Sequence, residues 1–284
     1  MKLCVVHLVW APLGNGPLER FVDSYRAHEA GIDHSLLVVF NGFSDERPPL
    51  ETLEGLVFEP LHLTEPMIDL AAYGTAAESV QATHLCFLNS YSELLADGWL
   101  EKLCRHLSTP GVGLVGATGS YERSAARPLG RIVGRSRLVP FPNPHIRTNA
   151  FMIPRELLLG LEWGEIREKA AAWQFETGRQ SMTRQVWRRG LEALVVARDG
   201  EAYPEERWYE SRTFRSGDQE NVLVADNRTR EYAEADEATR RWLAELAWGP
   251  DVIGGRSLPS RARNVGVRAR RLVARTRSSR PRVC

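Results

Sequence analysis

The chain of 284 residues is 43% hydrophobic and 26% charged, a composition typical of a globular protein with a substantial core, which excludes disorder throughout. The apolar run at residues 3–10 is far shorter than the roughly 20 residues of a membrane span. The N-terminus is not typical of a signal peptide, so a cytoplasmic protein is expected. The net charge of +1 hides an asymmetry, because residues 256–284 contain ten arginines and no acidic residue.

Apolar runs before residue 120 predict a series of strands. They lie at residues 2–10, 35–40, 55–58, 84–88 and 112–117. Three intervening segments have helical spacing or a helix-forming composition, at residues 18–30, 69–81 and 98–107. Strands and helices that alternate in this way predict an α/β fold with a doubly wound, mainly parallel sheet flanked by helices.

The pattern is looser in the second half of the chain. Residues 121–140 are rich in Arg, Gly and Ser and are expected to form a mobile loop. Further elements are predicted as a helical stretch at 165–189 interrupted near Thr177 and Gly178, a strand at 191–197 and a helix at 233–248. We expect one domain over residues 1–250 and an arginine-rich tail over residues 251–284.

The cysteines and histidines give no sign of a disulfide framework or a preformed metal centre. Cys4, Cys86, Cys104 and Cys284 are far apart and form no Cys-x-x-Cys pair, and the seven histidines lack paired ligand spacing. Cys4 and Cys86 fall in strand-like runs, where a buried thiol is the usual outcome.

Ligands of doubly wound sheets bind outside the carboxyl ends of the strands. This rule selects three polar loops of the chain, at residues 11–17, 41–45 and 89–93. Functional side chains are therefore expected to concentrate in these three loops.

The order of elements over residues 2–200 resembles the family 2 glycosyltransferases, whose nucleotide-sugar domain has the GT-A fold. The motif FNGFSD at residues 40–45 is similar to the family's DNGSxD turn, with Phe40 in place of the acid. The motifs DLAAY at 69–73 and FLNSYSE at 87–93 are most similar to the rhamnan-synthesis branch. The motif QFETG at 174–178 lies where the family carries its catalytic base.

The resemblance implies a transferase that moves a hexosyl or deoxyhexosyl group, with inversion, from a nucleotide-sugar donor to a saccharide or lipid-linked glycan of a bacterial-type surface polysaccharide. Glu176 would be the base that takes the acceptor's proton. The residues expected to bind the donor are Asn41, Asp45, Asp69, Asn89, Ser90, Ser92, Glu93, Arg147, Asn149 and Arg179. The residues expected to bind the acceptor are Trp208, Gln219 and Asn221.

The family's metal-binding D-x-D motif is absent, and the sequence Asn89-Ser90-Tyr91 takes its place. A divalent cation, Mn²⁺ or Mg²⁺, normally neutralises the departing diphosphate. Here either Glu93 or Asp97 replaces the missing ligand, or arginines such as Arg147 and Arg179 bind the phosphates directly. The loss of the motif also leaves open a non-catalytic protein that binds a sugar or nucleotide.

Several of these residues have structural explanations too. Glu176 could be a carboxylate favoured at a helix N-terminus, and residues 89–93 could cap a helix that begins near Leu94. Aromatic residues within 208–227 could simply pack in a surface loop, and residues 147–149 could be a solvated loop.

The basic tail has three interpretations. It could contact an anionic membrane, which would place the protein at the inner face of the membrane. It could be disordered or dock on the acidic remainder of the chain. Nucleic-acid binding is least favoured, because no aromatic residue is interleaved with the arginines.

Overall fold

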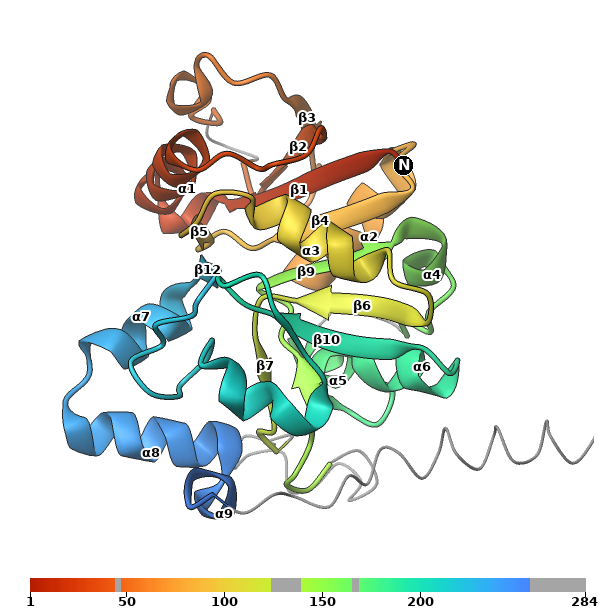
Figure 1. Cartoon of the computed structure of the whole chain (residues 1–284). Helices are drawn as coiled ribbons and strands as arrows, with labels where there is room; N and C mark the ends of the chain where they lie inside the picture. The colour runs from red at the N-terminus through yellow and green to blue at the C-terminus, as the bar shows by residue number, and fades with distance from the viewer. Residues whose placement is uncertain (44–46, 124–138, 165–168, 256–284) are drawn as a thin grey trace, which may run out of the picture.

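The computed structural model describes residues 1–43, 47–123, 139–164 and 169–255. Its centre is an eight-stranded sheet with the order β11-β10-β6-β9-β4-β1-β2-β3 (Figure 1). Residues 256–284 of the predicted tail and residues 124–138 of the predicted loop lie outside the described residues. None of the described helices is both long and apolar enough to cross a membrane.

The first half of the sheet is parallel. Strand β1 (Leu3–Trp10) pairs with β2 (Ser35–Asn41) on one side and with β4 (His84–Leu88) on the other, and β3 (Glu59–His62) pairs with β2. The prediction of a strand at 55–58 was wrong, because Gly55 forms a left-handed turn after the 3-10 helix η2 (Leu50–Leu53). The polar strand β3 is tolerated because it lies at the exposed edge of the sheet.

An antiparallel strand divides the second half. Strand β9 (Ala150–Pro154) lies between β4 and β6 (Val112–Gly116) and runs opposite to both. Strand β10 (Glu192–Val196) is parallel to β6, and β11 (Ala202–Tyr203) closes the edge in the antiparallel direction. The beginning of β9 therefore lies beside the carboxyl end of β4, where Leu88 is opposite Ala150.

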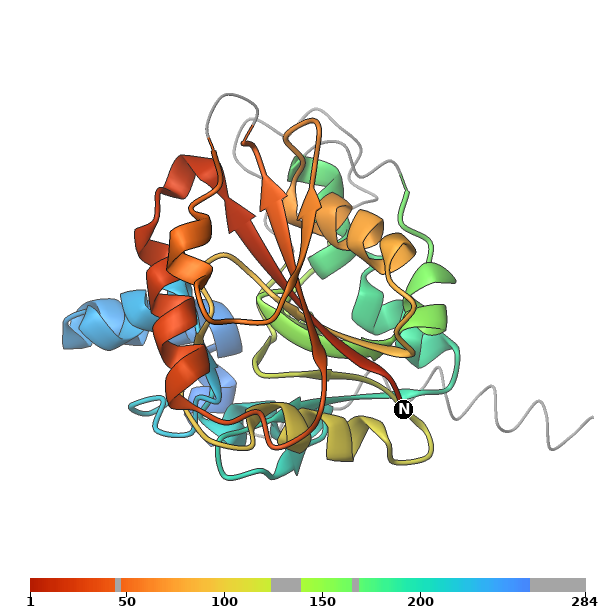
Figure 2. The same cartoon turned by 90° about the horizontal axis from the view of Figure 1, so that it is seen from above.

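Helices cover both faces of the sheet, which confirms the predicted mainly parallel, doubly wound α/β class. Figure 2 shows α1 (Gly16–Ala27) on one side and α2 (Asp69–Ser79) on the other. Alternate residues of β1 enter separate cores, with Val5 and Val9 facing α1 and Val6 and Leu8 facing α2. Helix α3 (Trp99–Leu107) joins the first core, and α4 (Arg155–Leu159), α5 (Lys169–Thr177) and α6 (Met182–Arg188) contribute to the second or pack against it.

The last described segment packs back onto the carboxyl edge of the sheet. The 3-10 helix η4 (Glu205–Ser211) is followed by β12 (Val224–Ala225), which pairs with β5 (Glu93–Leu94). Helices α7 (Asn227–Glu234), α8 (Glu237–Trp248) and α9 (Pro250–Ile253) complete it. The predicted helix at 233–248 is divided, because Asp236 caps the start of α8 with its side chain. Two minor strands, β7 (Gly119–Ser120) and β8 (His145–Ile146), pair nearby.

Candidate functional site

Two of the three predicted loops, at residues 11–17 and 89–93, meet at the carboxyl edge of the sheet, and part of the third, at residues 41–45, lies outside the described residues. The 3-10 helix η1 (Ala11–Leu13) follows β1, and a polar turn follows β4. A shallow surface depression between them is lined among others by His7, Trp10, Gly14 and Ser90. His7 is fully buried and stacks on Phe21 at 3.6 Å, and burial lowers the pKa of His7 to about 3.

The turn after β4 is closed by Asn89. Its Oδ1 accepts hydrogen bonds from the Tyr91 amide at 3.0 Å and the Ser92 hydroxyl at 3.1 Å. The chain then forms β5, and the next helix, α3, begins only at Trp99. The alternative that residues 89–93 cap a helix near Leu94 is therefore wrong, and the Asn89 side chain stabilises a turn instead.

Residues 147–149 approach this turn from the antiparallel strand. The Asn149 carbonyl accepts the Asn89 amide at 2.9 Å, and the Asn149 Oδ1 accepts the Thr118 hydroxyl at 2.7 Å. Arg147 donates to Thr118 and to Asp226, the latter at 2.7 Å, and its guanidinium lies 4.0 Å from the centre of the Phe214 ring. The alternative of a solvated loop does not describe these residues, because Asn149 is buried and Arg147 is largely so.

Asp226 is fully buried and has two partners besides Arg147. Its Oδ1 accepts the Arg228 and Thr229 amides at 3.0 and 2.8 Å, which caps α7. Burial would raise the pKa of Asp226, but the Arg147 charge and the Thr229 hydrogen bond outweigh it and hold that pKa below its usual value. Asp226 is thus a buried carboxylate that orients Arg147.

Glu176 lies in the last turn of α5, so its interpretation as a helix N-terminal carboxylate is wrong. The negative end of the helix dipole disfavours a carboxylate there. Thr148 compensates, because its amide and its hydroxyl both donate to Glu176 Oε1 at 3.0 Å. Among the described residues, none donates a hydrogen bond to Oε2.

Two buried titratable groups lie near Glu176. Burial raises the pKa of Tyr73, and the charges of Asp69 and Glu176 add to this effect. Burial lowers the pKa of His145, although the Glu176 charge opposes the shift. The Tyr73 hydroxyl is buried without a hydrogen-bond partner among the described residues.

The other residues predicted to bind the donor are dispersed. Asn41 is fully buried, and its amide group exchanges two hydrogen bonds with the Met67 backbone, at 2.6 and 2.8 Å. Asp69 is exposed in the first turn of α2, and Arg179 is exposed between α5 and α6. Asp45 lies outside the described residues. Phe40, which replaces the family's acid, is buried and stacks on His62.

The predicted acceptor residues make hydrogen bonds within their own segment. The buried indole of Trp208 donates to the Tyr203 carbonyl at 3.0 Å. Gln219 accepts the Arg215 amide and donates to the Thr229 carbonyl, both at 2.8 Å. Asn221 bonds both to the Asp199 carboxylate and to the Asp199 amide. Contact of these residues with an acceptor stays a prediction.

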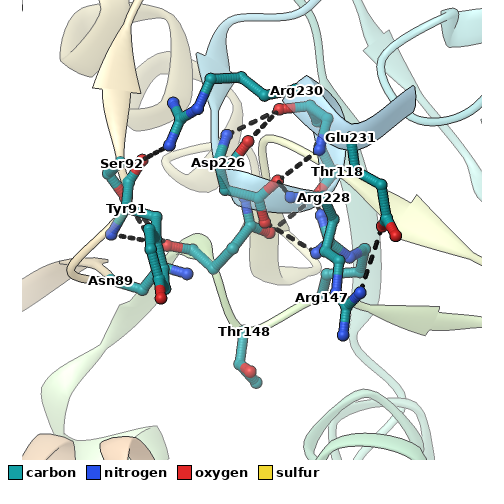
Figure 3. A network of polar contacts seen from close by, with 12 residues as sticks. Asn89, Tyr91, Ser92, Thr118, Arg147, Thr148, Asp226, Arg228, Arg230 and Glu231 are labelled. Atoms are coloured by element: carbon teal, nitrogen blue, oxygen red, sulfur yellow. Dashed lines mark hydrogen bonds and ion pairs between the residues drawn. The ribbon is translucent and has the colours of Figure 1, made fainter. Parts of the chain in front are cut away.

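Sequence reasoning missed a group of arginines at this edge (Figure 3). Arg230 of α7 donates to Glu93 at 3.0 Å and to the Tyr91 carbonyl at 3.2 Å. Arg215 and Arg228 both contact Glu231 at 3.2 Å. A sequence signal did exist, because residues 226–229 have the Asp-x-x-Thr spacing of a helix cap, which the structure forms.

Both residues predicted to replace the missing metal ligand already have a side-chain partner. Glu93, the predicted substitute ligand, pairs with Arg230, and Asp97 pairs with His28 at 3.2 Å. Among the described residues, no group of three or more His, Cys, Asp or Glu side chains is placed to hold a metal ion. Cys4, Cys86 and Cys104 are buried free thiols.

Comparisons with known proteins were made by sequence and by structure. No family model and no curated protein matches the sequence. The backbone is similar to a mannosyltransferase from Pyrobaculum calidifontis in complex with GDP-Man and Mn²⁺, with a TM-score of 0.47 and 15% identity over 99% of this chain and 76% of that one. It is also similar to TarS of S. aureus, with a TM-score of 0.46 and 12% identity over 87% and 70% of the two chains. These are distant likenesses of backbone arrangement.

Proposed function

We propose that this chain is a GT-A-like glycosyltransferase that uses a nucleotide-sugar donor. One observation carries the proposal. Thr148 holds the candidate base Glu176, and the next residue, Asn149, holds Asn89 in the candidate donor loop. Two motifs that are far apart in the sequence are thus joined by consecutive residues at the edge where doubly wound sheets bind ligands.

The geometry supports base catalysis by Glu176. Thr148 occupies Oε1 with two hydrogen bonds, which leaves Oε2 as the oxygen that receives the acceptor's proton. The acceptor oxygen then bonds to the anomeric carbon as the bond from that carbon to the donor's diphosphate oxygen breaks. Attack from the face opposite the leaving group inverts the anomeric configuration.

The remaining assignments follow the family resemblance. The donor nucleotide would lie over the ends of β1 and β2, and its diphosphate and sugar would lie near Asn89, Ser90 and Ser92. A hexosyl or deoxyhexosyl group would pass to a saccharide or lipid-linked glycan of a surface polysaccharide, as in the rhamnan-synthesis branch. We place the protein in the cytoplasm, with the arginine-rich tail as its contact with the inner face of the membrane.

Glu176→Gln tests the proposal. The substitution keeps the side chain's size and an oxygen that can accept from Thr148, but removes the basic carboxylate. We expect thermal stabilisation by the cognate nucleotide-sugar, from a panel of UDP-, GDP- and dTDP-sugars, in both wild type and variant. The rate of sugar transfer by the variant should be at least a hundredfold lower than that of the wild type.

A non-catalytic sugar- or nucleotide-binding protein is the second candidate. The missing D-x-D motif favours it. This candidate predicts nucleotide-sugar binding with no transfer by the wild type to any saccharide acceptor. If no nucleotide-sugar stabilises the wild type, the transferase proposal is wrong, and the second candidate is reduced to a protein that binds a free sugar or glycan.

A further inference from the structure

The arginine cluster, defined as Arg147, Arg215, Arg228 and Arg230, lies beside the turn that follows β4. These four guanidinium groups contact three carboxylates, those of Asp226, Glu231 and Glu93. Figure 3 shows Arg147 close to Asp226, while the Arg230 side chain extends away from Asp226 to the turn at Tyr91 and Ser92. Four guanidinium groups and three carboxylates leave one net positive charge at the edge of the sheet where the resemblance expects a cation.

The carboxylates of this edge are poorly suited to a divalent cation. Mg²⁺ and Mn²⁺ require several oxygen ligands with little competition from other cations. Asp226 is bonded to Arg147 and to two amides, and Glu93 is bonded to Arg230. The Asn89 Oδ1 is used by the turn itself. A metal ion would have to displace guanidinium groups from these oxygens.

Arg230 is the member of the cluster best placed to meet a ligand. Its guanidinium bonds to the carbonyl of Tyr91, the residue that stands where the D-x-D motif would end. The pair that it forms with Glu93 is partly exposed, with 25% and 32% of the two side chains accessible. Because solvent reaches this pair and screens it in part, a diphosphate, which carries more negative charge than one carboxylate, can compete with Glu93 for Arg230. Arg228 of the same helix is 56% exposed and pairs with Glu231 instead.

Arg147 has a different position. It is only 13% exposed, and its partner Asp226 is 1% exposed. The pair is closed off from solvent and stacked on Phe214. Arg147 thus stabilises the structure at the edge of the sheet, and Asp226 already neutralises its charge.

We propose that Arg230 binds the donor's diphosphate directly and replaces the divalent cation that the family resemblance expects. A guanidinium group presents parallel N–H donors that match two phosphate oxygens, and its fixed charge stabilises the diphosphate as it leaves. This inference rests on the proposed function. It makes donor binding independent of metal but dependent on salt concentration.

The test measures binding of UDP, GDP, CDP and dTDP to the full chain by calorimetry, in EDTA and in Mn²⁺. We expect one diphosphate to bind equally well in both. Arg230→Ala should weaken that binding at least tenfold, and Arg230→Lys should weaken it less, because the charge remains. Arg241→Ala is the matched control, since Arg241 is an exposed arginine of α8 paired with Glu245.

The Glu93→Gln variant distinguishes diphosphate binding by Arg230 from metal binding by Glu93. If Arg230 binds the diphosphate, this variant frees its guanidinium, and affinity should stay the same or rise. If Glu93 is a metal ligand, affinity should fall, and Mn²⁺ should be required in the wild type. That result would overturn the inference and leave the glycosyltransferase proposal intact. Binding of no nucleoside diphosphate under either condition would overturn both.

Discussion

Replacement of Asp226 by alanine is expected to destabilise the protein strongly. The substitution removes the partner of Arg147 and the acceptor for two amides of α7. Leaving one member of a buried ion pair uncompensated costs about 3–5 kcal/mol, and a lost helix cap costs about 1 kcal/mol. Because both effects act through one carboxylate, we expect a total of about 3–5 kcal/mol. Asp226→Asn keeps a capping oxygen and should cost about 1 kcal/mol less.

Urea unfolding of the variants gives this difference from the midpoint and slope of the transition. Asp236→Ala is the matched control, because Asp236 also caps a helix, through Thr239, but is exposed. The pKa of Asp226 is lowered in the folded state, so its contribution is complete above the usual carboxyl pKa of about 4. It is lost as the pH falls through the lowered value. A penalty for Asp226→Ala no larger than that of Asp236→Ala would refute the reasoning.

Three further variants test other parts of the structure. Thr148→Ala should lower turnover about tenfold with unchanged donor binding, because it loses one hydrogen bond to Glu176. Thr148→Ser should restore the rate. Equal activity of the two variants would show that the Thr148 hydroxyl does not position Glu176. Asn41→Ala should cost at least about 2 kcal/mol in urea unfolding, because two backbone groups of Met67 lose their partner. His7→Phe should stabilise the protein by about 2 kcal/mol more at pH 5 than at pH 7.5. The reason is that the wild-type histidine, with a pKa of about 3, stays neutral in the folded state and takes up a proton on unfolding. A stabilisation that does not depend on pH would show that His7 is not desolvated.

The regular parts of the sheet were predictable because local patterns determine them. Strands β1, β2, β4 and β6 are continuous apolar runs between helical segments, and that pattern is typical of strands buried on both faces. Strand β3 was misplaced because an edge strand needs no apolar run. The antiparallel direction of β9 depends on long-range pairing with β4 and β6, which no local pattern encodes.

The candidate site was predictable only as a set of residue types. The sequence selected Asn89, Asn149 and Glu176, and the structure brings all three to one edge. The sequence could not show that the Asn41 side chain is hydrogen-bonded to the Met67 backbone, because that contact joins two loops. The role of Arg230 was missed for the same reason, since its partners lie more than a hundred positions earlier in the chain.

The pairing of β5 with β12 and the contact of Arg230 with Glu93 have a consequence for synthesis of the protein. Strands β1–β4 emerge early from the ribosome, but residues 89–94 obtain their last partners only when residues 224–230 have been made. Contacts of such long sequence separation form late in folding. A chain interrupted before α7 would therefore lack the contacts that hold residues 91–94 in place, so this turn reaches its final structure only when the polypeptide is nearly complete.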